Sequence, residues 1–132
     1  MQNRSESRRI AMTCLYQMDI LKQNHLQYDV EEILKENCEV DNEFVKDLVF
    51  GVLTTQEELD TIANKYLKDW RIDRLDKTGV AILRMAIYEL KYMDTPAVVV
   101  INEAIELAKK YTDEDLVKMI NAVLDKFMKE EL

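Results

Sequence analysis

A chain of 132 residues with 48% hydrophobic and 33% charged residues has the composition of one globular domain rather than of a disordered segment. Two glycines and one proline are too few for the many turns of a β-sandwich or β-barrel, so the composition favours long helices. The net charge of −8 argues against general affinity for nucleic acid, yet residues 1–25 carry four basic and two acidic side chains, against 14 and 24 in the remainder.

The first predicted helix covers residues 10–21, where apolar residues recur at helical spacing after a candidate cap at Ser5 or Ser7. Arg4, Arg8 and Arg9 fall in or just before its first turn. Basic residues oppose the helix dipole at this end, which indicates a use for their charge. A solvated helix end is the alternative interpretation.

Three shorter amphipathic segments follow. Asp29 is the candidate cap of a helix through residues 30–34, Asp41 of a helix at 41–55, and Thr55 of a helix at 56–70.

The segment 75–93 is apolar on more than one face and is therefore predicted to be the central helix. Gly79 within it costs about 1 kcal/mol relative to alanine, unless close packing requires it. Residues 97–101 are β-branched, but Thr95 and Pro96 are a typical helix start, so a helix is predicted at 95–111. Thr112 caps a last helix that extends to residue 127. We expect seven helices in one all-α domain, residues 1–132.

The sequence holds few groups that could carry out catalysis. It has no apolar run of about 18 residues and no apolar signal-peptide core, so we expect a cytoplasmic chain without membrane association. Cys14 and Cys38 are expected to be free thiols, and His25 is the single histidine, so neither a metal site nor a cofactor is predicted. The pattern contains no phosphate-binding glycine loop and no nucleophile elbow, which argues against an enzyme.

Two asparagines adjoin the apolar stripes of the last two helices, Asn102 and Asn121. A buried amide needs hydrogen-bond partners, because leaving it unpaired costs about 1–3 kcal/mol. The amides either tie their helices to a neighbouring backbone or line a binding groove, and the spacing favours the first.

Several segments together resemble the NusB family of bacterial transcription antitermination factors, over essentially the whole chain. They are RRIAMTCLYQ at 8–17, DLVFGV at 47–52, ILRMAIYEL at 82–90, INEAIELAKKY at 101–111 and KMINAVLDK at 118–126. The resemblance implies two small helical subdomains packed together. It also implies a factor that binds the boxA element of ribosomal RNA transcripts with the ribosomal protein NusE, and that acts with RNA polymerase and other Nus factors.

Carried over by position, the resemblance implies two sets of contact residues. The RNA-binding positions are Arg4, Arg8, Arg9, Tyr16, Asp115, Lys118 and Met119, with Asn121 assigned to either RNA or a structural role and Asn102 to a structural role. The positions toward NusE are Asp73, Asp76, Gly79 and Val80. Some family members pair with themselves, so a homodimer is a further expectation.

The sequence departs from the family pattern at both predicted surfaces. Glu6 interrupts the basic N-terminus, and Met119 replaces a phenylalanine that could stack on a base. Leu116 stands where a small polar residue is common, and TGVAILR replaces VERAILR, so Gly79 and Val80 replace a charged pair. Two alternatives therefore stay open: a diverged helical interaction module, and an accessory RNA-binding domain of an RNA methyltransferase.

Overall fold

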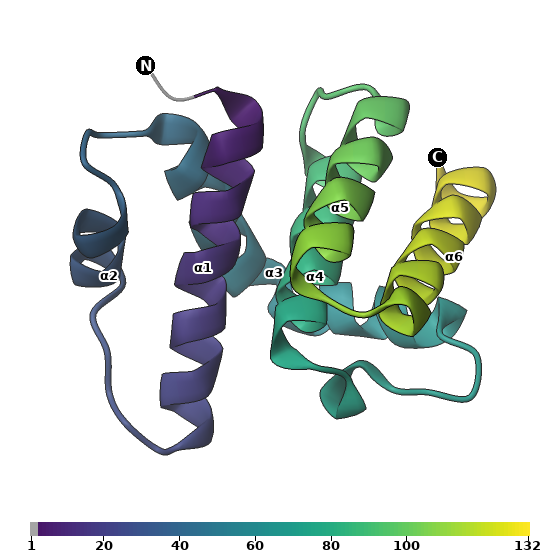
Figure 1. The fold of residues 1–132 in the computed structure, drawn as a ribbon, viewed down its shortest axis with the longest axis horizontal. Helices are drawn as coiled ribbons and strands as arrows, with labels where there is room; N and C mark the ends of the chain where they lie inside the picture. Colours follow the sequence, from purple (N-terminus) through teal and green to yellow (C-terminus); the bar gives the residue numbers. More distant parts are fainter. Residues whose placement is uncertain (1–2) are drawn as a thin grey trace.

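The computed structural model describes residues 3–132, and all regular structure in this range is helical (Figure 1). The helices are α1 (Arg4–Gln23), α2 (Val30–Asn37), α3 (Glu43–Tyr66), the 3-10 helix η1 (Ile72–Arg74), α4 (Lys77–Tyr92), α5 (Ala97–Tyr111) and α6 (Glu114–Glu131). The all-α prediction is confirmed. No helix in the described range is long and apolar enough to cross a membrane.

The two helices expected at 41–55 and 56–70 form one element, α3, with a kink at Thr55. The backbone of Thr55 has φ −117° and ψ 15°, outside the helical region. Its hydroxyl donates a 2.7 Å hydrogen bond to the carbonyl oxygen of Gly51, an interaction that bends helices. Two helical segments therefore meet at Thr55, the junction that the sequence predicts, and they follow each other without a loop. The hydroxyl of Thr55 bonds back to Gly51 and does not cap the second segment.

Each α-helix with a side-chain cap begins on a residue that accepts a hydrogen bond from the first turn. The cap predicted at Asp29 is confirmed, since its carboxylate accepts from the amide of Glu32. Elsewhere the caps differ from those predicted by one to four positions: they are Asn3, Asn42 and Asp113 rather than Ser5 or Ser7, Asp41 and Thr112. Thr112 instead donates to the carbonyl of Ala108 and so completes the end of α5.

Helix α4 is the central helix, as predicted. It packs against α1, α3, α5 and α6, and Figure 1 shows it between α1 and α2 on one side and α5 and α6 on the other. Nearly its whole length is buried, including Val80, Ile82, Leu83 and Ile87. Because α3 also runs from the first group of helices to the second, the two groups share two long elements.

Candidate nucleic-acid interface

Arg4, at the start of α1, is exposed and held over an aromatic ring. Its guanidinium carbon lies 4.0 Å from the centroid of the Phe44 ring, which is a cation–π contact. Asn3 caps the same turn by accepting a hydrogen bond from the amide of Glu6. Arg4 thus presents a positive charge to solvent from a fixed direction, which suits contact with a phosphate.

Arg8 does not face solvent. Only 4% of the surface of Arg8 is exposed, and its guanidinium donates two hydrogen bonds to the carboxylate of Glu89 in α4, at 2.9 and 2.6 Å. A second carboxylate, Glu103 of α5, lies 3.7 Å away. Burial works to lower the pKa of Arg8, but the hydrogen bonds to Glu89 and the charges of Glu89 and Glu103 leave it raised. The structure therefore contradicts direct phosphate contact by Arg8 in this conformation, because its donors are used to join α1 to α4 and α5.

Arg9 is partly exposed and carries its own counter-ion. Its guanidinium lies 2.6 Å from the Glu6 carboxylate, one turn earlier on the same helix. The hydrogen bond between them raises the pKa of Arg9 and lowers that of Glu6, so both side chains are charged at neutral pH. Glu6, which interrupts the basic N-terminus in the sequence, thus partly neutralises the charge of Arg9.

A groove of about 390 Å³ runs between the start of α1 and the second half of α5 and brings further basic residues to Arg9. Lys109, Lys110 and Tyr111 line it together with Arg9, and three carboxylates, Glu6, Glu103 and Glu106, line it as well. Lys109 is paired with Glu106, whereas Lys110 has no ion-pair partner within the described residues. The sequence reasoning missed Lys109, Lys110 and Tyr111, because two lysines in the last turn of a helix satisfy the helix dipole without any ligand. The signal that could have found them is the KKY run immediately before the predicted contact residues of the last helix.

Tyr16 lies two turns beyond Arg9 on α1 and is 39% exposed. At the other end of the surface, Asp115 and Lys118 are exposed on the first two turns of α6, whereas Met119 is half-buried against the core. Helices α4 and α5 separate α1 from α6, so the predicted positions form two groups, with the end of α5 between them (Figure 1).

Asn102 and Asn121 are both exposed, and neither side-chain amide makes a hydrogen bond within residues 3–132. The prediction that these amides tie helices together inside the core is therefore wrong. The physical reason is angular: Asn102 follows Ile101 by one residue, which is about 100° around the helix, so it lies beside the apolar stripe and not within it. Both amides are available to an external partner.

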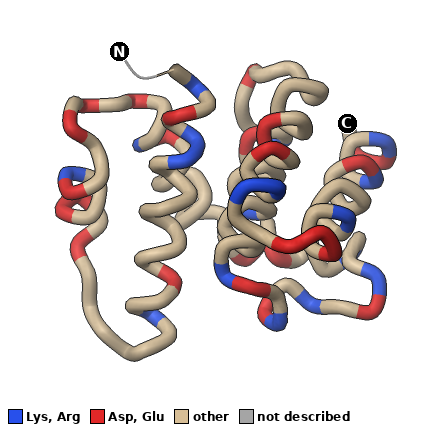
Figure 2. The backbone as a smooth tube through the Cα atoms, viewed as in Figure 1, with Lys and Arg blue, Asp and Glu red and all other residues tan. Residues whose placement is uncertain are grey.

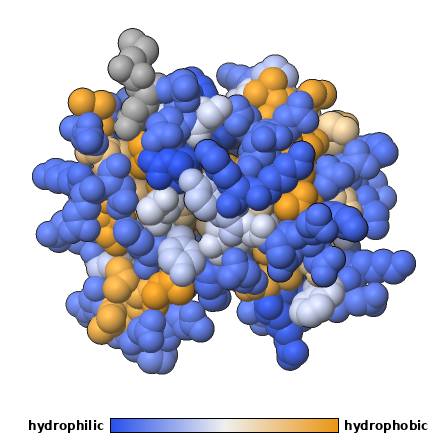
Figure 3. All heavy atoms as spheres, in the orientation of Figure 1, coloured by the Kyte–Doolittle hydropathy of each residue, from blue (hydrophilic) through white to orange (hydrophobic). Residues whose placement is uncertain are grey.

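Basic residues of three helices lie near one another, with acidic residues between them. Figure 2 shows blue segments at the start of α1, at the end of α5 and on α6, and a red segment between α5 and α6. In Figure 3 the centre of the face turned toward the viewer is hydrophilic to neutral, and the hydrophobic patches lie toward its edges. Such a face can contact a charged ligand over three helices.

The positions assigned to the protein partner separate into exposed and buried ones. Asp73 in η1 and Asp76, which caps α4, are exposed. Gly79 and Val80 are buried, so the structure does not present Val80 to a partner. A Cβ on residue 79 would stand 2.5 Å from Cδ2 of Leu116, so the close packing that could require this glycine is present.

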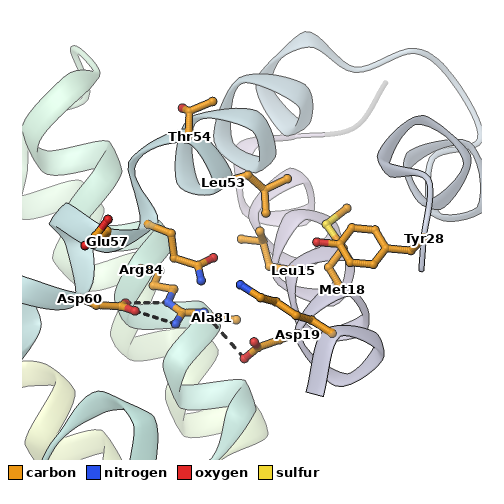
Figure 4. A pocket seen from close by; sticks show the side chains of 12 residues that line it. Leu15, Met18, Asp19, Tyr28, Leu53, Thr54, Glu57, Asp60, Ala81 and Arg84 are labelled. Carbon is orange, nitrogen blue, oxygen red and sulfur yellow. Dashed lines mark hydrogen bonds and ion pairs between the residues drawn. The ribbon is translucent and has the colours of Figure 1, made fainter. Parts of the chain in front are cut away.

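A cavity of about 610 Å³ lies between α1, α3 and α4, apart from every predicted site residue (Figure 4). Arg84 in its wall donates two hydrogen bonds to Asp60, at 2.8 and 2.9 Å, and lies 3.7 Å from Asp19. Lys77 is 3.6 Å from the same oxygen of Asp19. These ion pairs connect α1, α3 and α4, and the mixed charge of the wall favours no particular ligand.

Comparison with known proteins gives one consistent result. The family model described as the NusB family matches residues 5–129. A transcription antitermination protein NusB from Halalkalibacterium halodurans is 46% identical over 127 residues, covering 96% of this chain and 93% of that protein. The NusB of Staphylococcus aureus is 44% identical over 129 residues, covering 96% of this chain and 99% of that one.

Solved structures agree with this result. Thermotoga maritima NusB superposes with a TM-score of 0.85 at 31% identity, covering 98% of this chain and 92% of that one. A structure of the antitermination factors NusB and NusE in complex with double-stranded RNA matches with a TM-score of 0.82 at 30% identity, covering 96% of both chains.

Proposed function

Because this chain belongs to the NusB family, we propose that it is a transcription antitermination factor that binds boxA RNA of nascent ribosomal RNA together with NusE. The relatives named as transcription antitermination proteins match this chain over nearly their whole lengths, and one matching structure contains both NusE and RNA. Neither a diverged interaction module nor a methyltransferase accessory domain has comparable support. The factor acts by binding rather than by catalysis, in the cytoplasm, and reaches RNA polymerase with other Nus factors.

The observation that carries the RNA-binding part of the proposal is the basic strip across an acidic molecule. We define the RNA strip by exposed or partly exposed residues from three helices: Arg4, Arg9 and Tyr16 of α1, Lys110 of α5, and Lys118 of α6. Arginine and lysine side chains hold phosphates, while an exposed tyrosine ring can stack on an unpaired base. Asp115, Met119 and Asn121 stand beside Lys118, where they can contact bases.

Arg8 serves this strip indirectly. Its two hydrogen bonds to Glu89 fix α1 against α4, and the contact with Glu103 sets the distance between α1 and α5. Arg4 and Arg9 on one side and Lys110 on the other are therefore held at a defined separation, which is what recognition of a phosphate backbone requires.

The acidic residues of the molecule suit a basic ribosomal protein. Asp73 and Asp76 are exposed at the start of α4 and are the positions we propose for contact with NusE. Gly79 and Val80 are buried inside α4, so we assign them to the packing of this helix rather than to contact with the partner. A basic partner on this surface also lowers the repulsion between the chain, with its charge of −8, and RNA.

The test is a fluorescence-anisotropy titration of a boxA strand and a scrambled strand, each with and without NusE. We expect weak binding to the chain alone, tighter and boxA-specific binding with NusE, and an affinity that falls as salt rises. Lys110→Gln should weaken boxA binding, whereas Lys35→Gln, which removes an equal charge from α2, should not. Equal weak binding of both strands, unchanged by NusE, would contradict the proposal.

A further inference from the structure

A second surface, away from the RNA strip, combines aromatic rings with unpaired carboxylates. It is a shallow groove of about 530 Å³ between α3 and the end of α4, which we call the aromatic groove. Its lining residues are Asp47, Phe50, Gly51, Thr54, Tyr88, Tyr92, Met93 and Asp94. None of them belongs to the positions proposed above for RNA or NusE.

The floor of the groove is built by close approach of α4 to α3. Gly51 has no side chain, and the Tyr88 ring occupies that space: a Cβ at residue 51 would stand 2.1 Å from Cζ of Tyr88. The rings of Tyr88 and Tyr92 lie 5.2 Å apart at 33°. Phe50 and Tyr92 are 37% and 46% exposed, so two large rings meet solvent on one surface.

The orientation of the outer ring is fixed. The hydroxyl of Tyr92 donates a hydrogen bond to Glu58, and Lys91 lies 3.4 Å from the same carboxylate. The hydrogen bond from Tyr92 lowers the pKa of Glu58, which is therefore anionic at neutral pH. A ring that is held in place can serve as a platform without first losing rotational freedom on binding.

The edge of the groove is negative. Asp47 and Asp94 are exposed, and neither has an ion-pair partner within residues 3–132. Lys91, the basic residue beside Tyr92, is paired with Glu58, and its Nζ lies 5.5 Å from the centroid of the Tyr92 ring. The ring of Phe50 has no cation over it within the described residues. Exposed aromatic rings beside free carboxylates match the guanidinium of arginine, which stacks on ring faces and pairs with carboxylates at its edge. Single-stranded RNA could stack on the same rings, but the carboxylates repel its phosphates.

We propose that the aromatic groove docks an arginine-bearing segment of a protein partner, with the guanidinium stacked on the exposed ring of Phe50 and paired with Asp47 or Asp94. The residues that line the groove come from α3 and from the end of α4 with the turn after it, and none of them belongs to the RNA strip.

The test is a titration of the ¹⁵N-labelled chain with the peptide acetyl-Gly-Arg-Gly-Arg-Gly-amide, followed by amide chemical shifts, with the lysine version as a second probe. We expect the largest shifts at residues 47–54 and 88–94, and tighter binding of the arginine peptide. Replacing both Asp47→Asn and Asp94→Asn should weaken it by about fivefold, the size expected for two exposed charge pairs.

The matched control is Glu31→Gln with Glu36→Gln, which removes the same charge from α2 and should leave peptide binding unchanged. Phe50→Ala should also weaken the peptide while boxA binding with NusE stays intact, which separates this proposal from the proposed function. Shifts spread evenly over the acidic surface, or equal affinity for both peptides, would overturn it. So would groove shifts caused by a single-stranded RNA, or by concentrating the chain itself, since each assigns the groove to a different occupant.

Discussion

The guanidinium of Arg8 and the carboxylate of Glu89 form a two-bond ion pair inside the protein, with side chains that are 5% and 2% exposed. The pair joins residues that are 81 positions apart and connects the first helix to the central one. Removing one partner from a buried pair leaves an uncompensated charge, whereas replacing both with apolar residues is often tolerated.

Arg8→Met is therefore expected to lower the free energy of unfolding by about 3–5 kcal/mol. The double variant Arg8→Met with Glu89→Met should recover most of that loss, as followed by urea denaturation. Arg9→Met is the matched control. Because Arg9 is partly exposed, its substitution should lower the free energy of unfolding much less. If Arg8→Met leaves stability unchanged, the pair does not hold α1 to α4.

Glu6 is expected to restrain RNA binding through its pairing with Arg9. Glu6→Gln removes the counter-ion, so boxA affinity in the presence of NusE should rise by about twofold to fivefold, with a steeper dependence on salt. Fluorescence anisotropy measures both. Glu36→Gln on α2 changes the net charge equally and should have a smaller effect. An unchanged affinity and salt slope for Glu6→Gln would show that Arg9 does not reach the RNA.

Gly79 and Leu116 are expected to be energetically coupled, because the leucine side chain fills the space of the missing Cβ. Gly79→Ala gains helix propensity but displaces Leu116, and Leu116→Ala leaves a gap over Gly79. In the double variant the new methyl group enters that gap. Its loss of unfolding free energy should therefore be smaller, by about 1 kcal/mol, than the sum of the losses in the two single variants. Thermal or urea denaturation of the unmodified chain, both single variants and the double variant completes this double-mutant cycle. Strict additivity would exclude the contact.

The two thiols are expected to differ in reactivity. Burial raises the pKa of Cys14 to about 12, and burial also raises that of Cys38, which is only half-buried. At pH 8 an alkylating agent should label Cys38 slowly and Cys14 hardly at all, and urea should make them equal. The contribution of the Cys14 thiol to the free energy of unfolding is constant below its ordinary pKa of 9.0. It falls as the pH rises from there toward 12, because the thiol ionises first in the unfolded chain. Cys14→Ala should reduce this alkaline loss, measured as unfolding free energy against pH.

Helix periodicity was sufficient to predict the all-α fold and the central position of α4. It also located the junction of two helical segments at Thr55, although it predicted a capped start there and the structure has a kink without a loop. Caps were displaced by a few positions, because several Ser, Thr, Asp and Asn residues stand near each start and geometry chooses among them.

The candidate surface was harder to predict. Arg8 and Arg9 look alike in the sequence, but adjacent residues project about 100° apart on a helix, and Arg8 shares a row with Ala11 and Leu15. That row was the available signal for burial. Its partner Glu89 could not be identified by periodicity, because the contact depends on how α1 packs on α4. Lys110 was missed for the same reason, since only the packing of α5 beside α1 brings it to Arg9.

Helix α3 continues through its bend at Thr55 and takes part in both groups of helices. Neither group can lose its structure without releasing half of a helix on which the other depends. Calorimetry should accordingly record one cooperative heat-absorption peak, with the enthalpy from its area equal to that from its shape. For the molecule in the cell, a partner that stabilises one end therefore protects the other end from proteolysis as well.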